Sequence, residues 1–413
     1  MRILTVLSTF PPHSYGGGEI SAMNLSKWLA KQGHEVGVVT VADKDERELR
    51  GEIIEGLRVW RLHFPRPYTF WSHVKASKWQ KPWWYLQDHF DPRNRTLMAY
   101  VLDAFKPDCV DVQVITGIGY NALREIGRRK IPTVYFLHDL SLACLWGGMF
   151  KNGKICSKRC FECCVASHIR FADVTSIPFL AFCSPSRANL AKAASVLPLK
   201  KYKTASIFNA NIYPVPTVTH TNADHVRFLF VGRLEKSKGI DLLLSVLESL
   251  SQKYRFTINL LGDGAQAEGL FLRFGHHDWC HFKGHVSQEE VSNYMAQSDV
   301  LCTPSIWAEP LGGVVVQAFI LGLPVLGSDI GGIPELIDHD KNGLLIPPDD
   351  PEAWQQAIRS ILENPTRLQT WGAYAKANTE KFDQDINGRE ILMLFEDVVA
   401  MAKSDDKALL GSL

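Results

Sequence analysis

Short apolar segments alternate with longer amphipathic segments along almost the whole of this 413-residue chain. Short apolar runs between turn signals are typical of buried strands, and longer runs with a repeat near 3.6 residues are typical of helices. In the first half the pattern predicts strands at residues 2–7, 35–41, 110–114, 133–137, 182–184 and 204–208, and a helix at 19–32. Strands that alternate with helices form βαβ units around a parallel sheet.

The alternation stops at residues 211–224, where two prolines stand among Thr and Asn residues. It restarts with predicted strands at 226–231, 256–261, 300–303 and 324–327 and helices at 240–252, 288–297 and 312–321. The sequence therefore predicts an α/β protein with two Rossmann-like, doubly wound domains, residues 1–212 and 213–382, which bind ligands at the carboxyl ends of their strands. A last helix, at about 383–403, has one apolar face that suits packing on either domain.

Composition and charge exclude several classes of protein. With 46% apolar and 22% charged residues the chain is typical of a globular protein, and its net charge of +1 gives no sign of nucleic-acid binding. No run of 18 apolar residues is present, and the apolar start at residues 1–10 has no signal-peptide cleavage site. We therefore expect no transmembrane helix, and a cytoplasmic protein.

The charge is divided unevenly along the chain. Residues 1–212 carry 29 Lys and Arg against 17 Asp and Glu, and the remainder carries 16 against 27. A basic half suits peripheral contact with an anionic membrane face or with a phosphate-bearing acceptor, whereas a chance division of surface charge would give the same counts.

The most informative segment is SIWAEPLGGVVVQ, residues 305–317, between a predicted strand and a predicted helix. Glu309 lies in the connecting loop, and Gly312 lies at the helix start, where free backbone N–H groups and the helix dipole favour an anion. A carboxylate beside such a site suits hydrogen bonds from sugar hydroxyls next to a phosphate. The alternative is that Glu309 only caps the helix.

A second segment, VGRLEKSKGID at residues 231–241, follows the first strand of the second domain. The strand ends at Gly232, and Arg233 and Lys238 flank a polar turn before the next helix. Two cations at the carboxyl end of a strand suit a diphosphate, unless they are solvated loop charges.

Two segments of the first domain follow strands in the same way. Gly16, Gly17 and Gly18 precede the first helix, where glycines permit close approach of a ligand and the helix N-terminus favours an anion. This run is not the dinucleotide-binding signature. His138 directly follows the strand predicted at 133–137, which gives it a functional position, although a structural role is equally open.

Two further stretches have alternative interpretations. Residues 64–91 are dense in Trp, Tyr, Phe, His and Lys, and they form either an aromatic loop packed on the first domain or a surface for an acceptor or a membrane. The spacing of Cys144, Cys156, Cys160 and Cys163 in a cytoplasmic protein predicts a structural zinc site, with a loop of reduced thiols as the alternative.

In order along nearly the whole chain, these motifs resemble those of a family-4 glycosyltransferase. The motifs are GGGE at 16–19, His138, GRLEKSKG at 232–239, GDG at 262–264 and EPLGGVVVQAFILGLPVLGSDIGGIPELI at 309–337. The resemblance implies the GT-B fold, in which two Rossmann-like domains face a central cleft and the second holds most of the nucleotide sugar. It also implies retention of anomeric configuration, no metal requirement for transfer, and a last helix that packs back on the first domain.

The resemblance assigns roles to individual residues. Arg233 and Lys238 grip the diphosphate and stabilise the charge on the leaving phosphate, Glu309 binds hydroxyls of the transferred sugar, and His138 contacts that sugar from the first domain. Further contacts fall to the backbone of Leu311 and Gly312 for sugar and phosphate, to Gly16, Gly17 and Gly18 for diphosphate and acceptor, to Gly232 at the strand end, and to Asp263 and His285 near the nucleoside.

One position departs from the family pattern, because Gln317 stands eight residues after Glu309 where a second Glu is usual. That carboxylate accepts hydrogen bonds from the ribose hydroxyls. The Gln317 carbonyl still accepts, so we expect nucleotide binding to be weakened by about 1–2 kcal/mol and not lost.

The sequence thus predicts a retaining enzyme that moves a hexose from a UDP or GDP sugar to a sugar or lipid-linked saccharide acceptor in cell-surface polysaccharide synthesis. A dehydrogenase is disfavoured because the dinucleotide signature is absent. A phosphorylase or synthase that shares the fold is a second alternative. A non-catalytic scaffold that binds nucleotide sugars is a third, kept open by Gln317.

Overall fold

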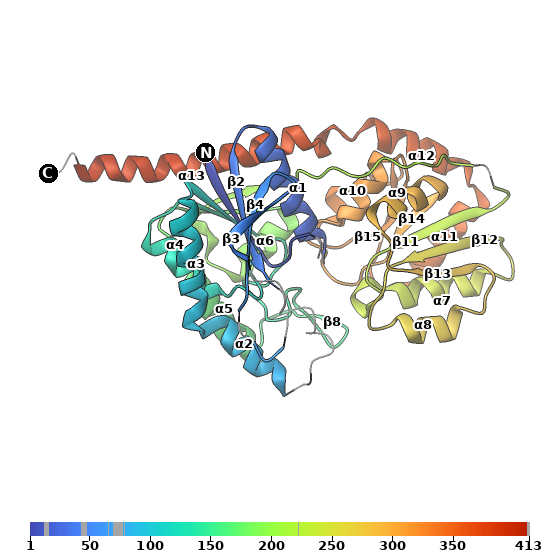
Figure 1. Ribbon diagram of the computed structural model, residues 1–413. Coiled ribbons are helices and arrows are strands. Elements are labelled where there is room, and N and C mark those ends of the chain that lie inside the picture. The colour runs from blue at the N-terminus through green and yellow to red at the C-terminus, as the bar shows by residue number, and fades with distance from the viewer. Residues whose placement is uncertain are drawn as a thin grey trace. The chain divides into compact units, whose positions relative to one another are not determined.

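The computed structural model describes residues 1–11, 16–42, 48–64, 66–68, 77, 79–221 and 223–410, without the side chains of residues 48–50 and 406–410. The chain forms two compact units (Figure 1). The first comprises Met1–Gly147, Arg159–Asn211 and the residues from Asp383 onward, and the second comprises Gly148–Lys158 and Ile212–Phe382. The predicted division after residue 212 thus missed one segment, since 148–158 belongs with the second unit.

The first unit is built on an eight-stranded sheet in the order β10-β9-β6-β5-β1-β2-β4-β3. Its strands are β1 (Arg2–Leu7), β2 (Glu35–Val41), β3 (Glu48–Ile54), β4 (Leu57–Leu62), β5 (Cys109–Val114), β6 (Thr133–Phe136), β9 (Leu180–Ser184) and β10 (Lys203–Ser206). Neighbouring strands are parallel except β3 and β4, which are antiparallel at one edge. Inner strands such as β1 are buried and rich in branched aliphatic residues, as parallel sheets covered on both faces require.

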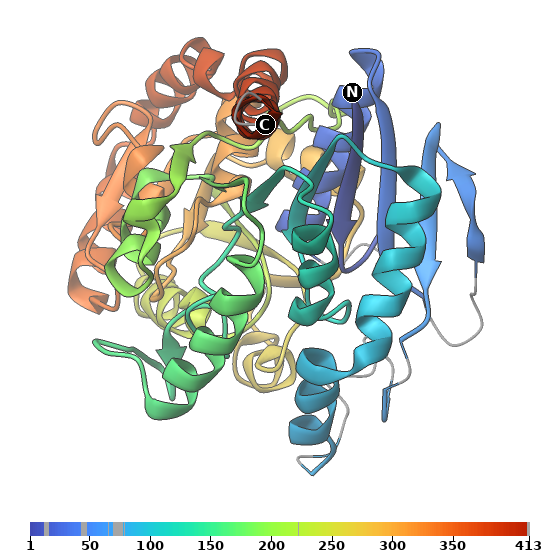
Figure 2. The same cartoon turned by 90° about the vertical axis from the view of Figure 1, so that its left-hand side faces the viewer.

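Helices cover both faces of this sheet. They are α1 (Gly17–Lys31), α2 (Gln80–Phe90), α3 (Pro92–Phe105), α4 (Leu123–Arg128), α5 (Phe161–Val174), α6 (Arg187–Val196) and α13 (Gln384–Leu410). Trp28 of α1 and Phe395 of α13 share a core with Val59 of β4. Trp60, the next residue, points to the opposite face, where its ring lies 5.5 Å from that of Phe105 in α3. Figure 2 shows α3 and α4 side by side.

The second unit has a six-stranded parallel sheet in the order β13-β12-β11-β14-β15-β16. Its strands are β11 (Val226–Val231), β12 (Phe256–Leu261), β13 (Cys280–Gly284), β14 (Val300–Thr303), β15 (Val325–Ser328) and β16 (Gly343–Ile346). Its helices are α7 (Ile240–Leu250), α8 (Ala267–Phe274), α9 (Gln288–Gln297), α10 (Gly313–Ile320), α11 (Pro351–Glu363) and α12 (Thr366–Ala377). Side chains from α7, α8, α11 and α12 fill one core with the strands. The hairpin β7 (Phe150–Lys151) and β8 (Lys154–Ile155) belongs to this unit.

The described elements extend the predicted pattern. The strands predicted at 2–7, 35–41, 226–231, 256–261 and 300–303 occur at those residues. The prediction missed β3 and β4 in the first unit and β13 and β16 in the second, and it left most of residues 64–91 without secondary structure although α2 begins at Gln80. The terminal helix belongs to the first unit. Among the described residues, no helix has the length and apolar character needed to cross a membrane.

Candidate active site

The loops after β11 and β14 meet at the carboxyl edge of the second unit's sheet. These strands are neighbours, and the strand order reverses between them, which is where doubly wound sheets bind ligands. Gly239 has a φ of 66°, and a Cβ there would lie 1.9 Å from the carbonyl oxygen of Pro304. The backbone N–H of Ile306 donates to the carbonyl oxygen of Ser237 at 2.9 Å. The two loops are therefore held together backbone to backbone.

Glu309 lies at this junction with one carboxylate oxygen fully engaged. Its Oε1 accepts hydrogen bonds from Lys238 Nζ at 2.5 Å, Ser305 Oγ at 2.6 Å and Trp307 Nε1 at 2.9 Å. The residue is 9% exposed, and no hydrogen bond to Oε2 is found within the described chain. The carboxylate is fixed through one oxygen, so the other is available to accept hydrogen bonds from a ligand.

The charge state of Glu309 follows from its surroundings. Burial raises the pKa of this carboxyl, but the Lys238 ammonium and the hydrogen bonds from Lys238, Ser305 and Trp307 outweigh burial and hold the pKa below its ordinary value. Glu309 is thus an ionised acceptor at neutral pH and unsuited to act as a general acid.

Arg233 occupies a different position from Lys238. The Arg233 side chain is 64% exposed and pairs with Glu235 at 3.0 Å. Lys238 is 20% exposed, and its ammonium also lies 5.5 Å from the centre of the Trp307 ring. The structure therefore brings one of the two predicted cations to Glu309 and leaves the other at the surface of the same loop.

The residues predicted to lie near the nucleoside follow neighbouring strands. A Cβ on Gly262, after β12, would lie 2.0 Å from the carbonyl oxygen of Gly232, after β11. The N–H of Gly262 donates to the carbonyl oxygen of Gly284 at 2.7 Å, and His285 comes next after β13. Gly232, Asp263 and His285 therefore lie on adjoining loops at one edge of the sheet.

The start of α10 is shaped by glycines from two loops. Gly312 has a φ of 97° and precedes the first helical residue, while Leu311 beside it is buried. The N–H of Gly332 donates to the carbonyl oxygen of Glu309 at 2.7 Å. A Cβ on Gly331 would lie 2.5 Å from the Glu309 nitrogen, so this approach requires glycine. The loop after β15 thus sets the backbone position of Glu309.

Gln317 does not lie open to a ligand. Its side chain is 3% exposed, and its Nε2 donates to Oγ of Ser292 at 3.1 Å. The hydrogen bond to Ser292 places the Gln317 side chain against α9. The predicted ribose contact uses the side-chain carbonyl oxygen, which the hydrogen bond from Nε2 does not occupy.

In the first unit the glycine run and His138 lie together. Gly16 precedes α1 with an extended backbone, and Gly17 begins the helix. A Cβ on Gly18 would lie 3.3 Å from His138 Cγ, so the glycine lets α1 start directly beside the imidazole. The sequence prediction placed both at strand ends, and the fold brings them into contact.

His138 is held by a buried polar chain that was not predicted. Its Nε2 forms a short hydrogen bond with Gln113 Oε1. Gln113 Nε2 donates to Asp111 Oδ1 at 2.7 Å, and Thr5 Oγ1 donates to Asp111 Oδ2 at 3.1 Å. Burial raises the pKa of Asp111 to about 7 and lowers that of His138 to about 4. His138 is therefore neutral at physiological pH.

This chain determines which imidazole nitrogen carries the proton. Both oxygens of Asp111 accept hydrogen bonds, one from Gln113 and one from Thr5, so Gln113 directs its amide N–H₂ toward Asp111 and its carbonyl toward His138. Nε2 of His138 then carries the hydrogen, and Nδ1 has the free lone pair. No hydrogen bond to Nδ1 is found in the part of the chain that the structure describes.

Two of the four cysteines of the predicted zinc site are in contact, with Sγ of Cys163 3.8 Å from Sγ of Cys144. Cys160 interacts with Cys163 at the start of α5, and Cys156 follows β8 in the segment that belongs with the second unit. Over the described ranges, no group of three or more His, Cys, Asp or Glu residues could hold a metal ion. All nine cysteines are free thiols. The zinc site stays a prediction.

Sequence reasoning also missed residues that position the site. Ser305 and Trp307 belong to the quoted motif, but only the fold shows that they donate to Glu309. A Cβ on Gly148 would lie 2.6 Å from the Trp307 ring, so the hairpin segment supports that ring. In the sequence, only the glycine at position 148 hints at this contact, and a single glycine is weak evidence.

Solved structures define the class of protein. Sucrose-phosphate synthase from Thermosynechococcus elongatus matches with a TM-score of 0.75 and 19% identity, covering 97% of this chain and 99% of that one. Anabaena HepE in complex with UDP and glucose matches with a TM-score of 0.68 and 18% identity, covering 95% and 99%. The chain has the GT-B fold of glycosyltransferases.

Sequence comparison defines the family. The model described as Glycosyltransferase Family 4 matches residues 15–161, and the model described as Glycosyl transferases group 1 matches residues 217–378. An uncharacterized glycosyltransferase of Methanocaldococcus jannaschii is 25% identical over 381 residues, which cover 88% of this chain and 90% of the relative. Glycogen synthase of Mycobacterium tuberculosis is 27% identical over 432 residues, covering 98% and 96%. The chain belongs to glycosyltransferase family 4.

Proposed function

We propose that this glycosyltransferase moves a hexose from a nucleoside diphosphate sugar to a saccharide or lipid-linked saccharide acceptor. The transfer retains the anomeric configuration and serves cell-surface polysaccharide synthesis. The observation that carries the proposal is the Glu309 carboxylate, which is ionised, fixed through Oε1 and open at Oε2. Such an oxygen accepts hydrogen bonds from sugar hydroxyls. UDP is the first donor base to test, with GDP second, because the Anabaena structure is a complex with UDP and glucose.

In the proposed step the acceptor hydroxyl oxygen bonds to the anomeric carbon on the face from which the diphosphate leaves. The bond from that carbon to the phosphate oxygen breaks, and the acceptor proton passes to the leaving phosphate. Lys238 stabilises the negative charge that develops on the diphosphate, Glu309 orients the sugar, and Arg233 is the second cation on the same loop. His138 serves as an acceptor for a sugar hydroxyl through Nδ1. The step uses no metal ion.

The alternative is a non-catalytic scaffold that binds nucleotide sugars. The observation in its favour is Gln317, whose amide is hydrogen-bonded to Ser292. In that case nucleotide binding would be retained and turnover would be absent.

The first experiment is hydrolysis of a panel of UDP- and GDP-linked hexoses by the wild type and by Glu309→Ala. We expect slow release of one nucleotide by the wild type and a loss of roughly 100-fold or more in the variant, as for removal of one transition-state contact. Glu289→Ala, on the exposed face of α9, is the matched control and should leave the rate unchanged. Nucleotide binding without turnover, even with added saccharide acceptors, would favour the scaffold, and equal rates in Glu309→Ala would remove the role of Glu309.

A further inference from the structure

Helix α2 carries a row of apolar side chains on its outer face. Exposed fractions are 92% for Trp79 just before the helix, 59% for Trp83, 50% for Leu86 and 56% for Phe90. Their spacing of four, three and four residues places them on one side of a helix. Trp84, by contrast, is buried on the inner side. The helix therefore presents an apolar stripe to the outside as well as to the core.

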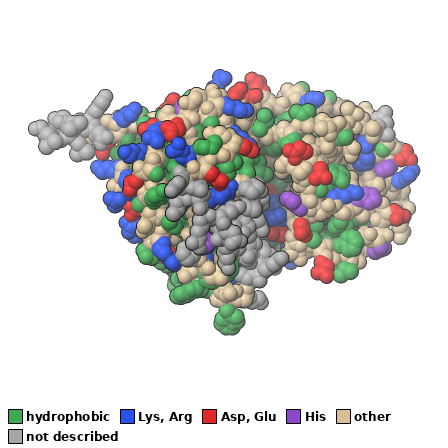
Figure 3. All heavy atoms as spheres, viewed as in Figure 1, with side chains coloured by type: hydrophobic (Ala, Val, Ile, Leu, Met, Phe, Trp, Pro, Cys, Tyr) green, Lys and Arg blue, Asp and Glu red, His purple; other side chains and the backbone are tan. Residues whose placement is uncertain are grey.

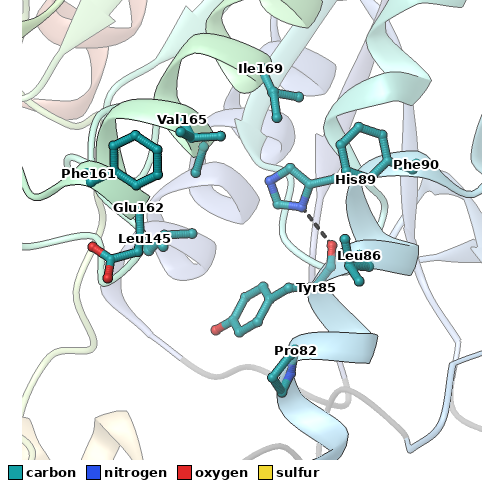
Figure 4. A pocket seen from close by; sticks show the side chains of 11 residues that line it. Pro82, Tyr85, Leu86, His89, Phe90, Leu145, Phe161, Glu162, Val165 and Ile169 are labelled. Carbon is teal, nitrogen blue, oxygen red and sulfur yellow. Dashed lines mark hydrogen bonds between the residues drawn. The ribbon is translucent and has the colours of Figure 1, made fainter.

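Helix α5 extends this apolar surface. Phe161 is 79% exposed and Val165 is 45% exposed, and Ile169 follows at the same spacing. Side chains of α2 and α5 point into a shared cavity of about 360 Å³ (Figure 4). We call this the α2–α5 patch; it consists of Trp79, Trp83, Leu86, Phe90, Phe161 and Val165.

The cavity between the two helices offers few groups for hydrogen bonding. His89 in its wall has both ring nitrogens engaged, with the Tyr85 carbonyl oxygen and with Arg170 Nε, each at 2.8 Å. Burial lowers the pKa of His89 to about 4, so its ring is neutral. Glu162 turns its carboxylate away from the cavity (Figure 4). The Tyr85 hydroxyl also points into the space (Figure 4), and the rest of the lining is mostly apolar, so the space suits a hydrocarbon chain.

The composition of the patch favours lipid over a protein partner. Protein interfaces carry about one hydrogen bond per 100–200 Å², and the patch offers few free donors or acceptors. Trp side chains with an adjacent apolar stripe are typical of helices that lie in the membrane interface. The first unit carries 29 Lys and Arg against 24 Asp and Glu, an excess of five positive charges, which attracts anionic lipid. Lys81 lies on α2 itself, whereas Lys75 and Lys78 are outside the described residues.

We propose that the α2–α5 patch inserts into the surface of an anionic lipid bilayer and anchors the first unit there. Figure 3 shows hydrophobic side chains at the lower end of this unit, where α2 begins in Figure 1. Buried Arg170 of α5 donates to His89 of α2 and to the Cys144 carbonyl oxygen, so the two helices are joined beneath the patch. Membrane binding by this patch does not depend on which nucleotide sugar the protein uses or on whether it transfers the sugar.

The test is sedimentation with vesicles of phosphatidylcholine alone and of an equimolar mixture with phosphatidylglycerol. We expect wild-type protein to bind the anionic vesicles, and the double variant Trp83→Ser with Phe161→Ser to bind about ten-fold or more weakly, because each ring loses its burial in hydrocarbon. The matched control is Phe271→Ser with Leu272→Ser on α8, whose side chains are 56% and 75% exposed, and it should bind like wild type. The difference in fluorescence between wild type and Trp83→Ser is the emission of Trp83. Brominated lipids should quench this emission.

Three outcomes would overturn the proposal. The first is wild-type protein that does not bind the anionic vesicles. The second is equal binding by wild type and the patch variant. The third is a wild-type dimer by light scattering without lipid that the patch variant loses, because a second copy would then cover the surface. Unchanged circular dichroism and thermal midpoint in the variant establish that it is folded, and none of these results bears on the nucleotide-sugar chemistry.

Discussion

At the scale of single residues, the surroundings of two carboxyl groups, Glu309 and Asp111, shift their pKa values in opposite directions. The pKa of Glu309 is lowered, so its interactions stabilise the fold above the ordinary carboxyl pKa and are lost as pH falls. The pKa of Asp111 is raised to about 7, so its contribution is complete in acid and is lost as pH rises through 7. Glu309 therefore acts as a fixed charge, whereas Asp111 titrates near physiological pH.

The hydrogen-bond chain to His138 gives a prediction about its tautomer. In Gln113→Leu the imidazole loses the acceptor for Nε2–H, so we expect the Nδ1–H form to increase, as seen in the ¹⁵N shifts of His138. Transfer efficiency, kcat/KM, should fall about ten-fold, the value of one hydrogen bond. Nucleotide affinity, measured by calorimetry, reports on the second unit and should be unchanged. An unaltered tautomer would contradict the proposed role of Gln113.

A second residue-scale prediction concerns Gln317. In Gln317→Glu the new carboxylate can accept from the Ser292 hydroxyl or, if it turns outward, from ribose hydroxyls. We expect nucleotide binding to be kept or tightened, by up to about ten-fold, as measured by calorimetry. Gln297→Glu, at an exposed position on α9, controls for the added charge. Weaker binding in Gln317→Glu alone would exclude the ribose role.

At the scale of elements, glycines decide how closely backbone can approach. Gly239 and Gly331 let the loops after β11 and β15 lie against the loop that carries Glu309. In the first unit, α13 crosses α1 closely at Gly388, where a Cβ would lie 2.7 Å from the Trp28 ring. Trp28 Nε1 donates to Asp385 at 2.6 Å at the same crossing. The C-terminal helix is thus attached at a defined point.

This crossing supplies an element-scale prediction. Gly388→Ala should lower the free energy of unfolding by about 1–3 kcal/mol, because the buried Trp28 ring cannot move aside without strain. Gly269→Ala in α8 is the matched control, since a Cβ there meets nothing within 4 Å and alanine favours helix by about 1 kcal/mol. Denaturant titration followed by circular dichroism measures both. Equal stabilisation by the two substitutions would show that α13 does not pack on Trp28.

At the scale of the whole molecule, the two units differ in charge and in the groups they offer a ligand. The loops at Glu309 and Lys238 belong to the second unit, whereas His138 and the α2–α5 patch belong to the first. The chain is therefore organised so that one unit carries the proposed donor-binding groups and the other carries the proposed membrane-binding surface.

This organisation predicts which part of the protein a nucleotide without its sugar binds and stabilises. At about 100 times its Kd, UDP or GDP should stabilise the native state by about 2.7 kcal/mol. Hydrogen exchange should slow in the loops at residues 232–239 and 304–313 of the second unit. Glu309→Ala should keep most of this protection, since Glu309 is assigned to the sugar. Protection confined to the first unit would place the nucleotide site elsewhere.

The sequence alone determined the two-sheet α/β plan, because strand and helix periodicities are local properties of the chain. It also placed His138 directly after a strand, and Glu309 and Lys238 in strand-to-helix loops, which parallel strands bring to one edge of a sheet. Only the tertiary structure decided the partners. The hydrogen bonds of Ser305 and Trp307 to Glu309, the Asp111–Gln113–His138 chain and the burial of Gln317 depend on which loops and helices pack together. It also showed that segment 148–158 belongs to the second unit, because contacts distant in sequence leave no periodic signal.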